Sequence, residues 1–177
     1  GKPATFNTEF TENGVTTLST NAVASKKTEM KAGSTFDGGN NTFFVGGADL
    51  ANYYESSTLR FIQTSGDATI QNMIIDGNNA AYEKNSTNYG IRGIFLTGAG
   101  TVTIDNVTIK NVTYCLNDDA AEKTLNVSNS TFEGWTSYNP QTTATFEGCT
   151  FMAGPNTNGF APHGETVVKD CSFKKDF

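Results

Sequence analysis

A six-residue pattern of apolar and polar positions occurs five times between residues 70 and 173. Its first and last positions are apolar, its third is Asn, Asp or Gly, and the other positions vary. The copies are Ile70–Ile75, Ile104–Ile109, Val127–Phe132, Phe146–Phe151 and Val168–Phe173. Their third residues are separated by steps of 34, 23, 19 and 22 residues. Three of the four steps are close to the repeat of about 20 residues that is typical of solenoids, and the longer first step requires an insertion.

Apolar and polar side chains alternate within each copy, which predicts two short strands joined at a bend. We expect the first, fourth and sixth positions to point into a core, and the second and fifth to face solvent. Ile74 is the exception among the fifth positions, which are otherwise Thr or Ser. One copy cannot bury its apolar side alone, whereas stacked copies can.

Stacking at the usual strand spacing of about 4.8 Å places like residues above like. Asn72, Asn106 and Asn129 then form a ladder of side-chain amides at a sharp bend, a conformation that Asn tolerates. Gly148 and Asp170 can adopt the same bend. We therefore predict an all-β fold, a single-stranded right-handed parallel β-helix. An antiparallel sandwich also has short strands every 8–12 residues or so. It does not require the same residue type at one position of successive copies.

The 177 residues suffice for one domain with a continuous core, so we predict a single β-helix domain over residues 1–177. Residues 30–177 hold the coils. Residues 1–29 are predicted to form an N-terminal cap or first strands, with Val15–Ala24 as a strand pair. No separate cap is visible after the last copy.

Composition and charge narrow the function classes. The net charge of −6 disfavours the broad basic surface that binds nucleic acid. No apolar run approaches the 18–20 residues or so of a membrane span. Six Asn-x-Ser/Thr sequences occur, several of them inside the repeating strands, which favours a bacterial protein without glycans. We expect a secreted or cell-surface location.

Two segments, Ile104–Asn111 and Gly33–Asn40, resemble coil segments of the pectin-lyase-like superfamily. That superfamily includes pectate lyases, polygalacturonases and many uncharacterised bacterial surface proteins. The resemblance covers residues 30–45 and 68–175, approximately, and lies in the core ladder rather than in a catalytic signature. It implies the β-helix fold and, by analogy, a role with carbohydrate.

The resemblance also implies candidate catalytic residues. A polygalacturonase-like hydrolase needs one carboxyl group as acid and another that activates water. Asp118 and Asp119, which follow Asn117, are similar to the paired aspartates of that family, and Pro-His163-Gly is similar to its Gly-His-Gly. However, His163 lies two coils downstream and the family's Arg-Ile-Lys is missing. The alternative is that these residues form turns or caps.

A lyase mechanism would need a base and a neutralising cation, often Ca²⁺ held by several carboxylates. Lys110 and Asp105 lie on the predicted exterior, and Arg92 precedes a strand. Asp76, Asp105 and Glu133 fall on neighbouring coils without forming a dense acidic cluster. We expect no cofactor and no metal, with Ca²⁺ as the open alternative.

Four aromatic residues are candidates for binding a polysaccharide or surface glycan. Trp135 and Tyr138 follow one coil, and Tyr82 and Tyr89 lie in the insertion. Flat rings contact the C–H faces of sugars, and nearby Asn, Gln and Thr can bond the hydroxyls. The alternative is that these rings pack against the outside of the core. We expect a protein that binds polysaccharide or acts as an adhesin without catalysis. A carbohydrate-active enzyme, either a polysaccharide lyase or a polygalacturonase-like hydrolase, is the alternative.

The three cysteines match neither a disulfide framework nor a metal-ligand spacing. Cys149 and Cys171 occupy the fourth position of successive copies, so they are expected to stack in the core. We interpret them as buried thiols, with a disulfide or reactive pair as the alternative.

Overall fold

The computed structural model describes residues 2–46, 49–78, 90–154, 157–174 and 176–177, and the chain is all-β. Within these residues the 3₁₀ turn η1 (Leu50–Tyr53) is the one helical segment, and no helix has the length and apolar character needed to cross a membrane. The strands are β1 (Ala4–Thr5), β2 (Val15–Thr17), β3 (Ala22–Ala24), β4 (Thr28–Glu29), β5 (Ser34–Val45), β6 (Tyr54–Glu55), β7 (Thr58–Gln63), β8 (Ala68–Asp76), β9 (Ile91–Leu96), β10 (Gly100–Lys110), β11 (Tyr114–Asp118), β12 (Lys123–Ser128), β13 (Thr131–Glu133), β14 (Trp135–Thr136), β15 (Thr142–Glu147), β16 (Thr150–Met152), β17 (Thr166–Lys169) and β18 (Ser172–Phe173).

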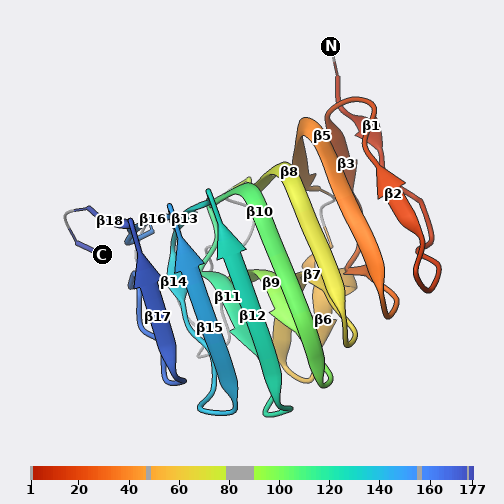
Figure 1. Ribbon diagram of the computed structural model, residues 1–177. Helices are drawn as coiled ribbons and strands as arrows, with labels where there is room; N and C mark the ends of the chain where they lie inside the picture. Colours follow the sequence, from red (N-terminus) through yellow and green to blue (C-terminus); the bar gives the residue numbers. More distant parts are fainter. Residues whose placement is uncertain (1, 47–48, 79–89, 155–156, 175) are drawn as a thin grey trace.

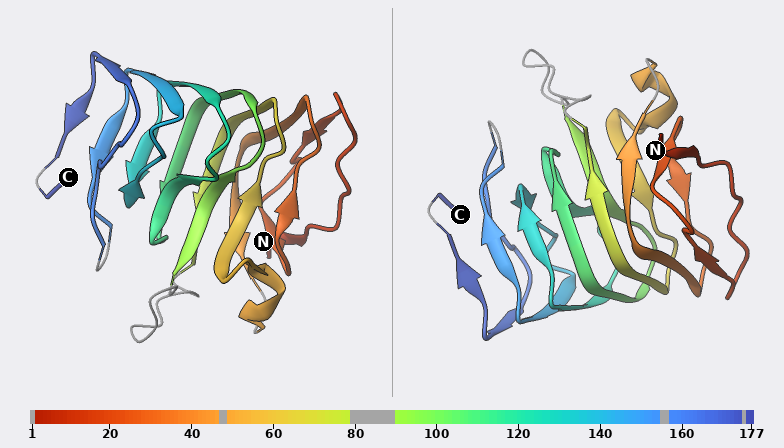
Figure 2. Two further views of the ribbon diagram at one scale, coloured as in Figure 1. Left: turned by 90° about the horizontal axis from the view of Figure 1, so that it is seen from below. Right: turned by 90° about the horizontal axis from the view of Figure 1, so that it is seen from above.

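These strands form two sheets (Figure 1). The larger has the order β1-β3-β5-β8-β10-β12-β15-β17, joined by β2, β13, β16 and β18, and the smaller has the order β14-β11-β9-β7-β4, joined by β6. β6 runs antiparallel to β7, and the other pairings of the described strands are parallel. Figures 1 and 2 show successive coils side by side along one axis. The arrangement is consistent with a parallel β solenoid.

The strand register confirms the six-residue repeat. Ile104 lies opposite Ile70 on one side and Val127 on the other, and the same column continues through Phe146 to Val168. Its first four members are at most 3% exposed, as predicted for an inward column. Val168 is 39% exposed, because the last coil has a neighbour on one side only within the described part of the chain.

The bend between the two strands of each copy has the predicted left-handed backbone. Asn72, Asn106, Asn129 and Asp170 have φ values of 51–55°, and Gly148 has 67°. The amide ladder is confirmed for one step only, where Asn106 Nδ2 donates to Asn72 Oδ1 at 3.0 Å.

For Asn129 the predicted ladder bond is wrong. Its Nδ2 donates to Asp105 Oδ1 at 3.2 Å rather than to Asn106. A carboxylate is the stronger acceptor, and this one lies directly before the expected partner in the same coil. The shape of the bend is therefore shared by every copy, whereas its side-chain bonding is not.

The coil that contains β5 has the same two strand segments as the five copies, both within β5. The bend between these segments has two additional residues. Phe36 lies opposite Ile70, and Phe43 lies opposite Ile75, with an irregularity between Asp37 and Asn41. Gly38 fits there because an added Cβ would come within 2.8 Å of the Cα of Met73 on β8. Because of these additional residues, this copy does not match the six-residue pattern.

The N-terminal residues supply strands and also cover one end of the core. β2 and β3 pair with β5, and β4 pairs with β7. The ring of Phe6 stacks on that of Phe36 with centroids 5.4 Å apart, and Phe10 contacts the same ring edge-on at 5.2 Å. Phe10 is only 5% exposed, so these rings close the core at this end.

Candidate functional site

A column of arginine and aromatic side chains crosses four strands of the smaller sheet. Arg60 on β7 lies opposite Arg92 on β9, Arg92 lies opposite Tyr114 on β11, and Tyr114 lies opposite Trp135 on β14. We call these four residues the arginine–aromatic column. The parallel register aligns one residue from each of four coils, so residues far apart in the sequence meet along one line.

Three members of the column, Arg92, Tyr114 and Trp135, stack on one another. The guanidinium carbon of Arg92 lies 4.6 Å from the centroid of the Tyr114 ring, and the rings of Tyr114 and Trp135 are nearly parallel with centroids 4.5 Å apart. Cation–π contact and offset stacking both favour this geometry. Trp135 was expected to present a flat face to a sugar, but one of its faces packs against Tyr114. The side chain as a whole is partly exposed, whereas its indole nitrogen is buried.

The Arg60 end of the column is a network of compensated charges. Arg60 Nη1 lies 3.3 Å from Glu55 Oε2 and donates to Gln63 Oε1 at 3.0 Å, while its guanidinium carbon lies 3.7 Å from the Phe95 ring centroid. Lys27 also pairs with Glu55. The hydrogen bond from Lys27 more than offsets the effect of burial and holds the pKa of Glu55 below its ordinary value.

Arg92 has no such compensation. It is only 7% exposed, and within the described part of the chain no carboxylate pairs with it. Its Nη1 donates to the carbonyl of Gly90 at 3.3 Å, and its Nε has no hydrogen-bond partner among the described residues. Burial, together with the positive charge of Arg60, lowers the pKa of Arg92, and Tyr114 acts in the opposite direction. Burying a cation with an unpaired donor raises the free energy of the folded state. A ligand that accepts a hydrogen bond from this donor would lower it.

Trp135 carries a second unused donor in the same column, because its buried Nε1 has no hydrogen-bond partner in the part of the chain that the structure describes. A second column adds polar and apolar groups, since Gln63 lies opposite Phe95 and Phe95 lies opposite Asn117. The outer side of the smaller sheet therefore gathers guanidinium, indole and amide groups in a confined area, and both arginine side chains are buried there. Hydroxyl-rich or anionic ligands are recognised by groups of this kind.

Connections between strands border this surface. The hairpin of β6 and β7, preceded by η1, extends beyond the body of the sheets in Figure 2 and carries Glu55 to Arg60. Tyr53 anchors the hairpin, because its hydroxyl donates to the carbonyls of Ala24 and Gly46 at 3.1 and 2.6 Å. Loops held on a rigid scaffold are where binding residues concentrate.

Of the two aromatic candidates that the structure describes, Trp135 lies in this surface and Tyr138 does not. The prediction that Tyr138 contacts a ligand is wrong, because Tyr138 is 1% exposed and its ring packs against Phe146. Its hydroxyl bonds Thr166 Oγ1, and burial raises its pKa to about 12. Tyr82 and Tyr89 lie outside the described residues.

Asp118 has a structural role in the described part of the chain. It is 6% exposed and accepts hydrogen bonds from the backbone N–H and Nδ2 of Asn139 and from Thr142 Oγ1 at 2.9, 2.7 and 2.6 Å. These bonds join two successive coils at the corner that follows the smaller sheet. Its oxygens are therefore occupied by the fold and face no open site.

Asp119 and His163 are not brought together as a catalytic pair. Asp119 accepts bonds from Lys123 Nζ and from the N–H groups of Gly98 and Ala121. His163 lies exposed on the loop after Phe160, with its backbone N–H bonded to the carbonyl of Tyr138. No hydrogen bond joins the imidazole to either aspartate among the described residues.

Sequence reasoning missed Arg60, and it placed Arg92 before a strand rather than within β9. A signal was present, since Leu59-Arg60-Phe61-Ile62 and Ile91-Arg92-Gly93-Ile94 both read apolar-Arg-x-Ile. The six-residue pattern does not extend to these strands, so it does not predict them.

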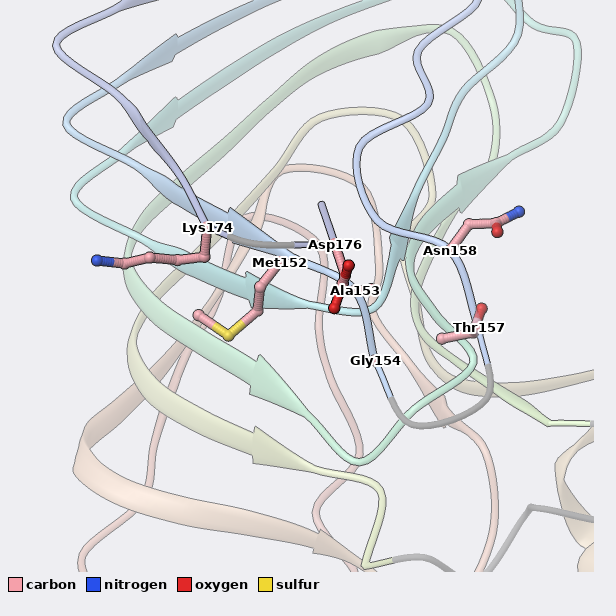
Figure 3. Close-up of a pocket in the computed structure, with 7 residues that line it drawn as sticks. All are labelled: Met152, Ala153, Gly154, Thr157, Asn158, Lys174 and Asp176. Carbon is pink, nitrogen blue, oxygen red and sulfur yellow. The ribbon is translucent and has the colours of Figure 1, made fainter.

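Two other places could hold a ligand. An open hollow of about 750 Å³ lies at the C-terminal end, lined by Met152, Ala153, Gly154, Thr157, Asn158, Lys174 and Asp176 (Figure 3). Figure 3 shows Met152 and Lys174 on one side of it and Thr157 and Asn158 on the other. Its side chains are few and sparse, so it offers less chemistry than the arginine–aromatic column. For metal ions, no cluster of three His, Cys, Asp or Glu residues occurs within the described ranges.

Comparison with known proteins supports the fold. No family model matches the sequence, and no curated protein matches it. Among solved structures, a protein from Parabacteroides merdae ATCC 43184 described as a "putative glycosyl hydrolase" superposes with a TM-score of 0.69 at 14% identity. The alignment covers 90% of this chain and 82% of the other. At this identity the likeness establishes a shared all-β fold with parallel sheets.

Proposed function

We propose that this chain is a right-handed parallel β-helix of the pectin-lyase-like type that binds a polysaccharide or surface glycan without cleaving it. The binding surface is the outer face of the smaller sheet, and the protein acts outside the cell or at its surface. The observation that carries the proposal is the arginine–aromatic column, in which two buried donors, Arg92 Nε and Trp135 Nε1, have no hydrogen-bond partner among the described residues. The structural neighbour adds a carbohydrate-related precedent for the fold.

The chemistry of this surface fits recognition better than bond cleavage. Hydrolysis of a glycosidic bond requires a protonated carboxylic acid beside a carboxylate. The carboxylates nearest Arg60 are Glu55 and Asp119, and both have pKa values below their ordinary values. Both are therefore ionised at neutral pH. They can orient cations and accept hydrogen bonds, but neither supplies the acid.

Affinity electrophoresis in native gels tests the proposal. A panel of neutral and acidic polysaccharides is cast into the gels, and wild-type protein is expected to be retarded by at least one of them. Trp135→Ala removes the indole N–H and the end of the column, so retardation should fall at least tenfold in apparent affinity. Thr143→Ala, on the exposed side of β15 in the larger sheet, is the matched control and should bind like wild type. Absence of retardation on every polysaccharide would refute the proposal.

Catalysis is the second candidate, and one observation favours it: the charge of Arg60 interacts with both Glu55 and Asp119, which brings two carboxylates to one end of the column. Assays for new reducing ends and for unsaturated products on the polysaccharides that bind would detect a hydrolase or a lyase, respectively. Product formation that is lost in Glu55→Gln or Asp119→Asn, with binding retained, would replace the binding proposal by an enzymatic one.

A further inference from the structure

Cys149 and Cys171 lie in neighbouring coils at equivalent positions. Glu147 is opposite Lys169 before them and Thr150 is opposite Ser172 after them, so the offset of 22 residues is kept on both sides of the pair. Parallel neighbouring strands are about 4.8 Å apart, which is within the 4.4–6.8 Å or so between the Cα atoms of a disulfide.

The two side chains point to the same side of the sheet and contact each other. The backbone N–H of Cys149 donates to Cys171 Sγ at 3.4 Å. Cys149 is 1% exposed within the core, and Cys171 packs against that core while remaining partly exposed. Both are free thiols in the structure.

We propose that Cys149 and Cys171 form a reversible disulfide when the protein meets an oxidant of the disulfide class, and that this bond fastens the last coil to the one before it. The third cysteine, Cys115, takes no part, because it is fully buried and belongs to another coil.

The chemistry begins at the accessible sulfur. The thiolate of Cys171 attacks an external disulfide, such as oxidised glutathione, and forms a mixed disulfide while one glutathione thiolate leaves. Cys149 then loses its proton, attacks Cys171 Sγ and expels the second glutathione. The protein loses two hydrogens, and one external disulfide becomes two thiols. Burial raises the pKa of Cys149 to about 11, which keeps it protonated at neutral pH and makes it the second thiol to react.

Within the described residues, the bond would join the last coil, which has a neighbour on one side only, to the coil before it. β17 and β18 each pair with one neighbour, and Val168 and Phe173 are 39% and 41% exposed in columns that are buried elsewhere. Such an end opens locally at low free-energy cost. A link between coils would restrict that opening and would also fix one wall of the C-terminal hollow, to which Lys174 belongs.

The test is to incubate folded protein with oxidised glutathione at pH 8.5 and to measure its intact mass, its peptide map and its Tm. The expected product has lost two hydrogens, carries a Cys149–Cys171 cross-link, keeps Cys115 as a thiol and melts a few degrees higher than the reduced protein. Dithiothreitol should reverse each change.

Cys171→Ser is the matched variant, because position 171 is partly exposed and tolerates a small polar side chain. It should show neither the mass loss nor the rise in Tm. A glutathione adduct on Cys171 that persists beside a free Cys149 would overturn the proposal, as would cross-links to Cys115 or complete resistance to oxidation. These measurements on wild-type protein decide the matter even if the variant folds poorly, and none depends on carbohydrate binding.

Discussion

At the level of single side chains, Arg92 and Arg60 differ in what surrounds them. Both are less than 10% exposed, and they lie opposite each other on neighbouring strands. Arg60 is bound by Glu55, Gln63 and Thr58, whereas Arg92 lies over the Tyr114 ring with an unused Nε. Equivalent positions of a solenoid therefore have different energetic roles, and the uncompensated one is the better indicator of ligand binding.

The substitution Arg92→Met tests this difference. Methionine keeps most of the apolar volume and removes a desolvated charge, so we expect the free energy of unfolding to be unchanged or to rise by about 1 kcal/mol. Carbohydrate retardation in affinity gels should nevertheless be lost. Arg60→Met is the matched comparison. It breaks an ion pair and two hydrogen bonds, and should destabilise by about 1–3 kcal/mol. Strong destabilisation by Arg92→Met would show that Arg92 is needed for folding.

At the level of strands and connections, the sequence pattern predicts the larger sheet well and the smaller sheet poorly. β12 alternates between buried and exposed residues because one of its sides faces solvent. All six residues of β9 are buried, including Arg92 and Phe95 on its outer side. A strand buried on both sides has no alternation to detect. The candidate site lies on this sheet, so Arg60 was missed and Arg92 was placed before a strand for the same reason.

The corner after β11 gives a pH-dependent prediction. Burial alone would raise the pKa of Asp119, but bonds from Lys123 Nζ and from the N–H groups of Gly98 and Ala121 lower it below its ordinary value of 3.8. The folded state therefore binds this proton less tightly than the unfolded state does. The stabilisation is present above pH 3.8 and is lost as pH falls through the lower pKa of the folded state.

Urea unfolding of wild type and Asp119→Asn between pH 2 and pH 7 measures this contribution. Because Asp119 is partly exposed, the difference at pH 7 should be modest, about 0.5–1 kcal/mol in favour of wild type. It should shrink towards zero as the carboxylate becomes protonated at the acid end. A difference that stays constant across the whole range would mean that the charge of Asp119 is irrelevant and that only its hydrogen bonds contribute.

At the level of the whole molecule, each coil is stabilised by its contacts with the neighbouring coils. Phe132 and Phe173 occupy the same column, in which Phe132 pairs with Phe151 and Phe151 pairs with Phe173. Phe132 is fully buried between two coils, whereas Phe173 is 41% exposed on the last one. In a quasi-one-dimensional structure, stability depends on contacts between nearest neighbours, so the same side chain should contribute differently in the middle and at the end.

Phe132→Ala and Phe173→Ala form a matched pair for this gradient. We expect Phe132→Ala to lower the free energy of unfolding by about 3–5 kcal/mol, because it leaves a cavity between coils that cannot collapse. Phe173→Ala should cost less than about 1.5 kcal/mol, because its ring is already half in water. Hydrogen exchange should show the matching order, with β18 amides exchanging fastest and β10 amides slowest. Equal destabilisation by both substitutions would mean that the last coil is as firmly held as the middle, and the Cys149–Cys171 link would then have no loose end to fasten.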